Sequence, residues 1–433
     1  MNLPIVCIAK AVRTIGFGAV SVVLALFLMD KGFSTAEVGA LFSLTLLEDA
    51  FITTVAAVFA NRLGMRCVLL AASAVILLGG FALAFAEVKW VLALAVIFGI
   101  VSPAGYEGGP FAPIEQAIIS QSVKKEKLAS AYSWYNLVGF GGAALGALLA
   151  GGCVALMKSQ PPVQAYQSIF IFNAISSFLL AILYLTMDIA EAPLNAAKAS
   201  LQQVLKSAKE SWKDIFAGQT ASKQRIRKLA GLQALDAFGG GFVVQSLLTC
   251  WFYQRYHVDA TFIGPVYFGC NVIAAFSFVL APIFVKRIGL LNSMVFTHLP
   301  CSLALCLLPF LPTAGWAAGL LLLRSFFSSM DIPARQAYTM LIVPEEERPA
   351  AAGVTSSARA VAQGIAPCLT GFLMTNAVTG LPIILAGLFK SVYDVSLYYA
   401  FKHVPFHDDQ ADHAPPMESP ADALESRKPE SVR

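Results

Sequence analysis

The chain has 433 residues, of which 57% are hydrophobic and only 13% charged, and its mean hydropathy is +0.70. Soluble domains carry about a quarter charged residues, and much of any globule must face water, so an ordinary soluble enzyme or binding domain is excluded. The net charge of +4 is small, and we expect no nucleic-acid partner.

Apolar runs recur along the chain with short polar breaks between them. A bilayer-spanning helix needs about 20 apolar residues, and Gly and Pro are tolerated inside such helices because neighbouring helices satisfy the freed backbone groups. We therefore predict an all-α membrane protein with twelve transmembrane helices. Their spans are 5–29, 36–59, 66–86, 90–120, 128–152, 167–187, 231–254, 261–284, 289–311, 314–342, 350–375 and 381–402.

The polar segments divide the chain into four parts. We predict an N-terminal six-helix bundle over 1–187, a central cytoplasmic linker over 188–230, a C-terminal six-helix bundle over 231–403 and a disordered cytoplasmic tail over 404–433. In the linker, apolar residues from Leu201 to Phe216 follow helical spacing with Lys206, Lys209 and Lys213 between them. This pattern predicts an amphipathic helix on the anionic inner leaflet, with a solvated linker helix as the alternative.

Lys and Arg are unevenly shared between the alternate loops. One set of loops holds sixteen of them and the other set holds four, namely Lys31, Lys89, Lys158 and Arg255. Because basic loops stay in the cytoplasm, we expect both termini to be cytoplasmic. The location is then a plasma membrane (the inner membrane in a bacterium), crossed many times.

The two halves of the chain resemble each other at a spacing of 225 residues. Gly16-Phe17 matches Gly241-Phe242, and Arg62-Leu63-Gly64 matches Arg287-Ile288-Gly289; a second block, 113–117 against 333–337, repeats at 220. Repeats of parallel topology indicate two pseudo-symmetric bundles with a site between them near the bilayer midplane.

The break after the second segment, Asn61-Arg62-Leu63-Gly64-Met65-Arg66, resembles the loop signature of the major facilitator superfamily, and the second half has a weaker copy from Lys286 to Leu291. The resemblance covers about residues 5 to 402 and implies the twelve-helix major facilitator fold and transport by alternating access. The signature's acidic residue is Asn61 in one copy and Lys286 in the other, so the cytoplasmic lock that this acid supports in the family should be weaker or built differently.

The resemblance also implies a set of gating residues at the cytoplasmic side. Glu115 is expected to pair there with Arg62 or Arg66, and Asp331 can pair with Arg335 four residues later on one helix face. Lys390 and Asp394 have the same spacing. The complete predicted gating set is Asn61, Arg62, Gly64, Arg66, Glu115, Lys286, Arg287, Gly289, Asp331 and Arg335.

Ionisable residues at membrane depth are costly, by about 2.5 kcal/mol or more each, and should face a cavity, a partner or a water path. Glu48, Asp49 and Glu107 have no partner close in sequence, and Gly108, Gly109 and Pro110 open the helix after Glu107. Desolvation favours the protonated form of a carboxylate, and a nearby Arg opposes it, so such groups can couple protons to substrate; satisfied helix contacts are the alternative. The predicted coupling and substrate residues are Asp49, Glu48, Glu107, Arg13, Arg359 and Asp236.

These features predict a secondary transporter of a small organic solute, with proton-coupled efflux favoured and uptake or exchange of a polar or anionic nutrient as the alternative. A receptor or scaffold that transports nothing is the rival class. We expect no enzyme activity, no cofactor and no metal. The expected partners are the solute, protons and the lipid bilayer, and the expected state is a monomer. No phosphate-binding loop of the form G-x-x-x-x-G-K-[ST] occurs, so the chain is not its own ATP-driven pump.

Overall fold

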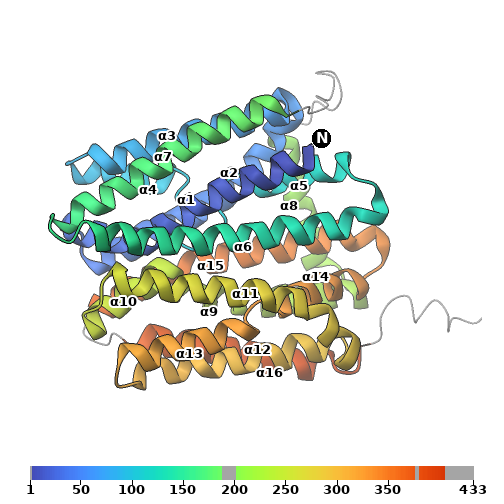
Figure 1. Cartoon of the computed structure of the whole chain (residues 1–433). Helices are drawn as coiled ribbons and strands as arrows, with labels where there is room; N and C mark the ends of the chain where they lie inside the picture. The colour runs from blue at the N-terminus through green and yellow to red at the C-terminus, as the bar shows by residue number, and fades with distance from the viewer. Residues whose placement is uncertain (1, 188–200, 376–379, 405–433) are drawn as a thin grey trace, which may run out of the picture.

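The computed structural model describes residues 2–187, 201–375 and 380–404, and over these ranges the regular secondary structure is helical. Figure 1 shows most of the helices running roughly parallel and antiparallel to one axis, while α8 runs across it. In chain order the helices are α1 (Asn2–Asp30), α2 (Thr35–Leu63), α3 (Met65–Phe85), α4 (Lys89–Phe98), α5 (Phe111–Ser122), α6 (Lys125–Leu156), α7 (Pro162–Thr186), α8 (Leu201–Ala217), α9 (Ala221–Gly241), α10 (Gln245–Tyr256), α11 (Ala260–Ile288), α12 (Leu290–Leu307), η1 (Leu308–Phe310), α13 (Ala314–Phe327), α14 (Asp331–Leu341), η2 (Glu345–Glu347), α15 (Arg348–Thr375) and α16 (Leu381–Phe401).

All twelve predicted segments are helical, but three of them are interrupted. The fourth segment is α4 followed by α5, the seventh is α9 followed by α10, and the tenth is α13 followed by α14. Eight helices of the described chain are long and apolar enough to cross a bilayer alone, and α9 with α10 makes a ninth span with a bend of 41°. The remaining segments are the other two interrupted pairs and α15, which is consistent with twelve spans.

The sequence repeat reappears as matching helices. α2 and α11 both have 29 residues, and each begins and ends 225 residues from its counterpart. The glycines that follow them, Gly64 and Gly289, have positive φ angles of 91° and 83°, a backbone region that side chains other than Gly rarely adopt. The signature glycine therefore makes the same tight turn in both halves.

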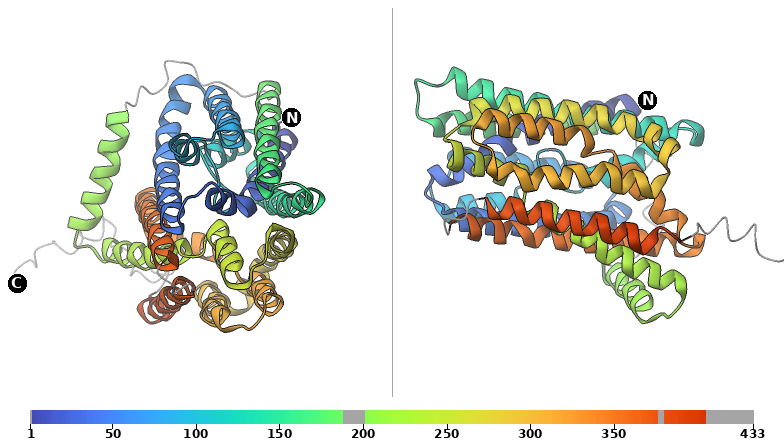
Figure 2. Two further views of the ribbon diagram at one scale, coloured as in Figure 1. Left: turned by 90° about the vertical axis from the view of Figure 1, so that its left-hand side faces the viewer. Right: turned by 90° about the horizontal axis from the view of Figure 1, so that it is seen from below.

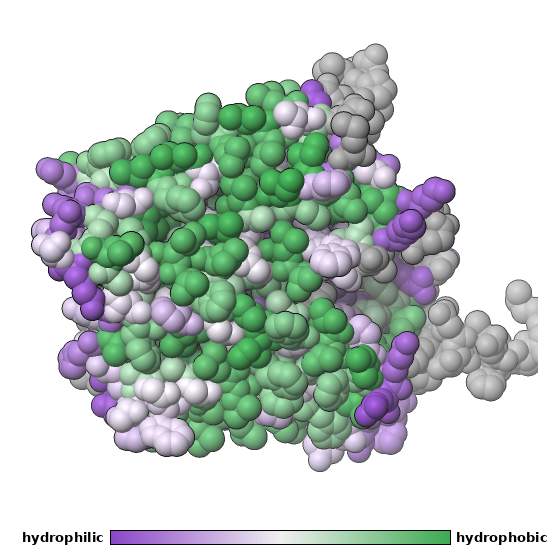
Figure 3. Space-filling model, in the orientation of Figure 1, coloured by the Kyte–Doolittle hydropathy of each residue, from purple (hydrophilic) through white to green (hydrophobic). Residues whose placement is uncertain are grey.

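The helices form two bundles, and the middle of their outer surface is apolar. Helices α1 to α7 lie in the upper part of Figure 1 and α9 to α16 in the lower part, and Figure 2 shows the two groups packed face to face. Apolar side chains cover the middle of the visible face and hydrophilic ones gather at its two ends (Figure 3). This is the surface expected of helices that cross a bilayer, because only the ends meet water.

The halves are in closest contact at one end of the molecule. We call the end with Gly64 and Gly289 the basic end, and the end with Gly32 and His257 the opposite end. Near the opposite end α2 packs directly on α15, since a Cβ added to Gly39 would lie 2.4 Å from the Pro367 carbonyl oxygen. At the same end, α11 packs directly on α6, since a Cβ added to Gly264 would lie 2.9 Å from the Gly151 Cα.

Hydrogen bonds between the halves follow the same distribution. The Gln254 amide donates to Thr35 Oγ1 at 3.0 Å, and the Ser246 backbone N–H donates to the Pro103 carbonyl oxygen at 3.0 Å. The structure describes further hydrogen bonds between the two bundles, from the Gln245 amide to Ser21 Oγ and from the Cys368 backbone N–H to Ser43 Oγ, and these lie at mid-depth or toward the opposite end. The structure is therefore the conformation that is closed at the opposite end.

The predicted amphipathic helix corresponds to α8, which Figure 2 shows lying outside the two bundles at the basic end. Its inner side contacts the C-terminal half through the buried Ile215, while Lys206 and Phe216 are exposed. Residues 188–200 of the predicted linker and 405–433 of the predicted tail lie outside the described residues.

Candidate functional site

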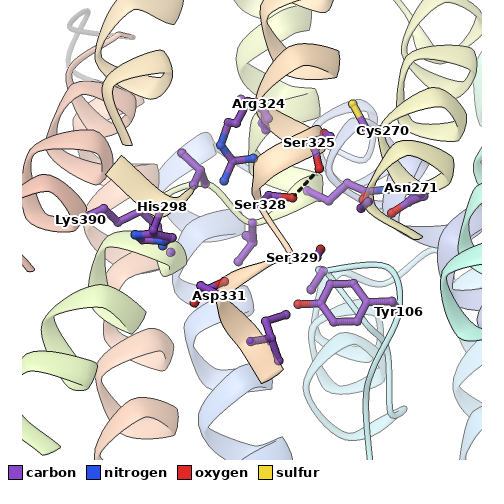
Figure 4. Close-up of a pocket in the computed structure, with 18 of the residues that line it drawn as sticks. Tyr106, Cys270, Asn271, His298, Arg324, Ser325, Ser328, Ser329, Asp331 and Lys390 are labelled. Atoms are coloured by element: carbon purple, nitrogen blue, oxygen red, sulfur yellow. Dashed lines mark hydrogen bonds between the residues drawn. The ribbon is translucent and has the colours of Figure 1, made fainter. Parts of the chain in front are cut away.

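A cavity of about 320 Å³ lies between the halves, mainly within the C-terminal one. Figure 4 shows its side chains converging where α13 stops and α14 begins. The wall includes residues from the interruptions of all three broken segments: Ala104 and Tyr106 between α4 and α5, Val243 and Val244 between α9 and α10, and Ser328 and Ser329 between α13 and α14. Helix breaks free backbone and polar groups at membrane depth, which is tolerated where they line a cavity.

The ionisable residues of the cavity wall are concentrated on the C-terminal half. They are Asp236, His298, Arg324, Asp331, Arg335, Arg359 and Lys390. Two of the predicted coupling residues, Asp236 and Arg359, therefore line the cavity. Asp331 and Arg335, which the sequence assigned to gating, line it as well.

Asp236 on α9 is the centre of this charged group. It is 2% exposed, and its carboxylate receives Lys390 Nζ at 2.7 Å, Arg359 Nη1 at 2.9 Å and Arg335 Nη1 at 3.2 Å. His298 Nε2 lies 3.5 Å from the same carboxylate. One buried carboxylate thus connects α9 to α12, α14, α15 and α16. Removing one partner of a buried ion pair strongly destabilises a protein, because the other charge is left unpaired.

A second buried carboxylate lies behind the first. Asp394 on α16 is fully buried, with Oδ1 2.8 Å from His298 Nδ1 and Oδ2 accepting from Ser302 Oγ at 3.1 Å. His298 therefore stands between two aspartates, with one ring nitrogen facing each. Histidine can carry a proton between neighbouring groups because both of its nitrogens can bind one.

The structure tests the two ion pairs expected within single helices. Asp331 and Arg335 do pair, at 3.0 Å, which confirms that prediction. The pairing of Lys390 with Asp394 is wrong, because Lys390 binds Asp236 and Asp394 binds His298. The spacing places these two groups on one face of α16, but each of them pairs with a residue on a neighbouring helix instead.

The N-terminal half holds a second charged centre with the polarity reversed. Arg13 on α1 makes a two-pronged ion pair with Glu115 on α5, at 2.7 and 2.8 Å, and both side chains are fully buried. The hydroxyls of Tyr135 and Tyr184 each donate to Glu115 at 2.7 Å. In the sequence repeat, Arg335 occupies the position that corresponds to Glu115. The first half joins a cation on its first segment, Arg13, to a carboxylate on its fourth segment, Glu115. In the second half the charges are exchanged: the carboxylate, Asp236, lies on the first segment and the cation, Arg335, on the fourth.

This centre changes the expected role of Glu115. The predicted partners were Arg62 and Arg66, whereas in this conformation Glu115 is saturated by Arg13 and two tyrosines. Arg66 donates to the Met187 carbonyl oxygen at 2.6 Å. The side chains of Asn61 and Arg62 lie outside the described residues. The closed basic end to which the gate prediction refers is not the conformation observed.

The three carboxylates expected to lack partners have different surroundings. Glu107 forms an ion pair with Lys10, so the expectation of an unpaired Glu107 is wrong. Asp49 accepts a hydrogen bond from the Gly109 backbone N–H. Glu48 is half-buried, and its Oε1 is buried without a hydrogen-bond partner in the described chain. None of the three lines the cavity.

The interruption between α4 and α5 explains the position of two of these groups. The sequence indicated an opening at Gly108, Gly109 and Pro110, and the structure extends it over residues 99–110. Ile100, Gly105 and Gly109 have positive φ angles there. The looped backbone presents Tyr106 to the cavity and turns Gly109 N–H toward Asp49.

Sequence reasoning left three charged side chains out of the candidate site that the structure places in it or beside it. Lys390 and Arg324 line the cavity, and Asp394 completes the chain from Asp236 through His298. His298, which lies between these two aspartates, was not predicted as a site residue. The sequence did indicate that the C-terminal helices carry ionisable groups at membrane depth. It could not indicate which of these groups pair, because the partners lie on different helices.

Two bundles of interrupted helices with a charged cavity between them are typical of secondary transporters. The family model described as Major Facilitator Superfamily matches residues 6–367, and the chain belongs to this family. The uncharacterized membrane protein YJR124C of Saccharomyces cerevisiae is 26% identical over 417 residues, which are 90% of this chain and 91% of the relative.

Solved structures share the fold at low sequence identity. A POT family transporter in complex with 5-aminolevulinic acid matches with a TM-score of 0.73 and 12% identity, over 93% of this chain and 96% of that one. A D-xylose–proton symporter matches with a TM-score of 0.68 and 14% identity, over 94% and 98%.

Proposed function

We propose that the chain is a secondary active transporter that moves a small organic solute by alternating access and couples this movement to protons. The observation that carries the proposal is the buried Asp236, which lines the cavity and holds cations from three helices. A carboxylate in this position links the charge inside the cavity to the packing of the bundle.

Protonation of Asp236 would change the charge inside the cavity and the packing of the bundle at once. The neutral side chain would no longer balance Lys390, Arg359 and Arg335, so these cations would be free to meet a solute or to repack. His298 faces Asp236 with one ring nitrogen and Asp394 with the other. It thereby offers the proton a route from the cavity wall into the bundle. A D-xylose–proton symporter with the same fold supports coupling of this kind.

We propose a second proton-sensitive group in the N-terminal half. Glu107 pairs with the buried Lys10 while its own side chain is 40% exposed, so water can reach the carboxylate. Asp49 approaches the same loop through the Gly109 N–H. These groups, predicted from the sequence as coupling residues, lie outside the cavity wall, and they would act through the loop that carries Tyr106.

We propose that the basic end faces the cytoplasm of a plasma membrane, or of an inner membrane in a bacterium. The sixteen-to-four bias of Lys and Arg between the loop sets supports this orientation. α8 would lie on the inner leaflet, with the exposed Lys206 toward lipid headgroups and the exposed Phe216 at the interface. The observed conformation is then closed to the outside.

Export in exchange for protons is the direction expected from the sequence, and uptake of an anionic nutrient is the second candidate. The second is favoured by the cavity wall, where four basic side chains outnumber the two aspartates. Both share the cavity and the coupling groups, so one experiment can separate them.

The test begins with an untargeted comparison of metabolites in cells with and without the protein. Each solute whose cellular level changes is then offered to proteoliposomes with and without an imposed pH gradient. Gradient-driven movement supports the proposal, and its sign distinguishes export from uptake. Equal movement with and without the gradient would show that protons are not coupled.

A further inference from the structure

The cavity contains one basic side chain that no carboxylate balances. Arg324, in the last turn of α13, lines the cavity, and its Nε is buried without a hydrogen-bond partner. Within the described parts of the chain, its guanidinium forms no ion pair or hydrogen bond. By contrast, Arg335, Arg359 and Lys390 each bind Asp236.

An unbalanced cation at this depth has an energetic cost that proteins normally remove. Arg stays protonated in proteins, and a lone charge inside a membrane protein is destabilising. The missing countercharge can come from a ligand that occupies the cavity.

Other polar groups on the cavity wall are also without protein partners. The side-chain amide of Asn271 on α11 and the hydroxyls of Ser329 and Tyr106 make no hydrogen bond within the described chain. Figure 4 shows these groups and Arg324 around one space, with Ser328 turned back toward Ser325. Each of the unpartnered groups can donate a hydrogen bond, and together they form a set of donors without a negative group of their own.

We propose that the transported solute is an organic anion whose carboxylate or phosphate binds Arg324, with Asn271, Ser329 and Tyr106 as further hydrogen-bond donors. A guanidinium presents parallel N–H groups that match the two oxygens of such an anion. The volume of about 320 Å³ suits a small molecule. This inference rests on the proposed function, because it assigns a solute class to the same cavity.

The experiment measures binding in lipid nanodiscs, with no gradient. Purified protein is mixed with organic carboxylates, phosphate esters, their uncharged amides and alcohols, and organic amines, and its thermal unfolding is followed. We expect anions to stabilise the wild type and their uncharged counterparts to do so far less. The carboxylates and the phosphate esters show separately which oxyanion is preferred.

Variants assign the binding to the proposed group. Arg324→Gln should weaken the binding of the best anion about tenfold or more, because a hydrogen bond to a charged group is worth about 1.5–3 kcal/mol. Arg324→Lys should retain part of it. Without ligand, Arg324→Gln should unfold at the wild-type temperature or higher, since it removes an unbalanced charge. Arg255→Gln, exposed at the opposite end, is the control and should bind as the wild type does.

Two results would overturn the proposal: a panel in which no anion stabilises the wild type more than its uncharged counterpart, or unchanged anion binding in Arg324→Gln. Asn271→Ala, with its charge unchanged, should weaken the same anion less than Arg324→Gln does. Because no transport is measured, anion binding without gradient-driven movement would contradict the proposed coupling and leave the solute class supported.

Discussion

The close approach of α6 and α11 at the opposite end can be opened by a single methyl group. A Cβ added to Gly264 would lie 2.5 Å from the Ala147 carbonyl oxygen and 2.9 Å from the Gly151 Cα. Both distances are shorter than real Cβ contacts, and the atoms in the way are backbone, so the helices must separate. Overpacking of this kind costs about 1–3 kcal/mol, which shifts a two-state balance roughly 5- to 150-fold. Gly264→Ala should therefore populate the conformation that is open at the opposite end.

Distances between spin labels at the two ends would measure this shift. Labels at Lys158 and Arg255 span the opposite end, and labels at Ser120 and Lys286 span the basic end; carried on unnatural amino acids, they avoid the native cysteines. In Gly264→Ala the first distance should lengthen and the second shorten. Gly152→Ala is the matched control, because nothing lies within 4 Å of its added Cβ. If Gly264→Ala keeps the wild-type distances, or Gly152→Ala changes them equally, the contact does not hold this end closed.

Three further outcomes follow from the same contacts. Glu115→Gln should lower the free energy of unfolding by about 3–5 kcal/mol, because it strands the buried Arg13; chemical denaturation measures this, and a neutral result would show that the ion pair is not needed. Glu107→Gln should remove part of the gradient-driven accumulation in proteoliposomes while exchange continues, and Asp49→Asn should do the same; wild-type accumulation in the double variant would leave both carboxylates a structural role only. Reporter fusions should read outside, inside, outside and inside after Lys31, Arg66, Lys158 and Arg433, and an external reading at Arg433 would contradict the orientation.

Helix positions were predictable from the sequence because lipid imposes a simple rule. A run of apolar residues must be helical where no water satisfies the backbone. The repeat of Gly64 at Gly289 even anticipated the matching turns. The interruptions were less visible: Gly108, Gly109 and Pro110 indicated one of them. The break between α13 and α14 falls at Ser328 and Ser329, which local propensity does not distinguish from a helix.

The partners of the buried charges could not be read in the same way. Asp331 and Arg335 pair within one helix, where spacing is informative. The centre at Asp236 takes its cations from α14, α15 and α16. Lys390 pairs with Asp236 and not with Asp394, and this depends on how these helices turn against each other. Charges at membrane depth therefore indicated which residues matter, while tertiary packing decided which of them meet.

The most direct test of the account is proton movement driven by the solute itself. Proteoliposomes loaded with a pH-sensitive dye receive the identified solute on one side, and the internal pH is followed for the wild type, Asp236→Asn and Lys206→Gln, the last changing an exposed residue of α8. The account predicts a pH change in the wild type and in Lys206→Gln, and none in Asp236→Asn, even where labelled solute still exchanges. An equal pH change in Asp236→Asn would contradict the claim that this carboxylate couples protons to transport.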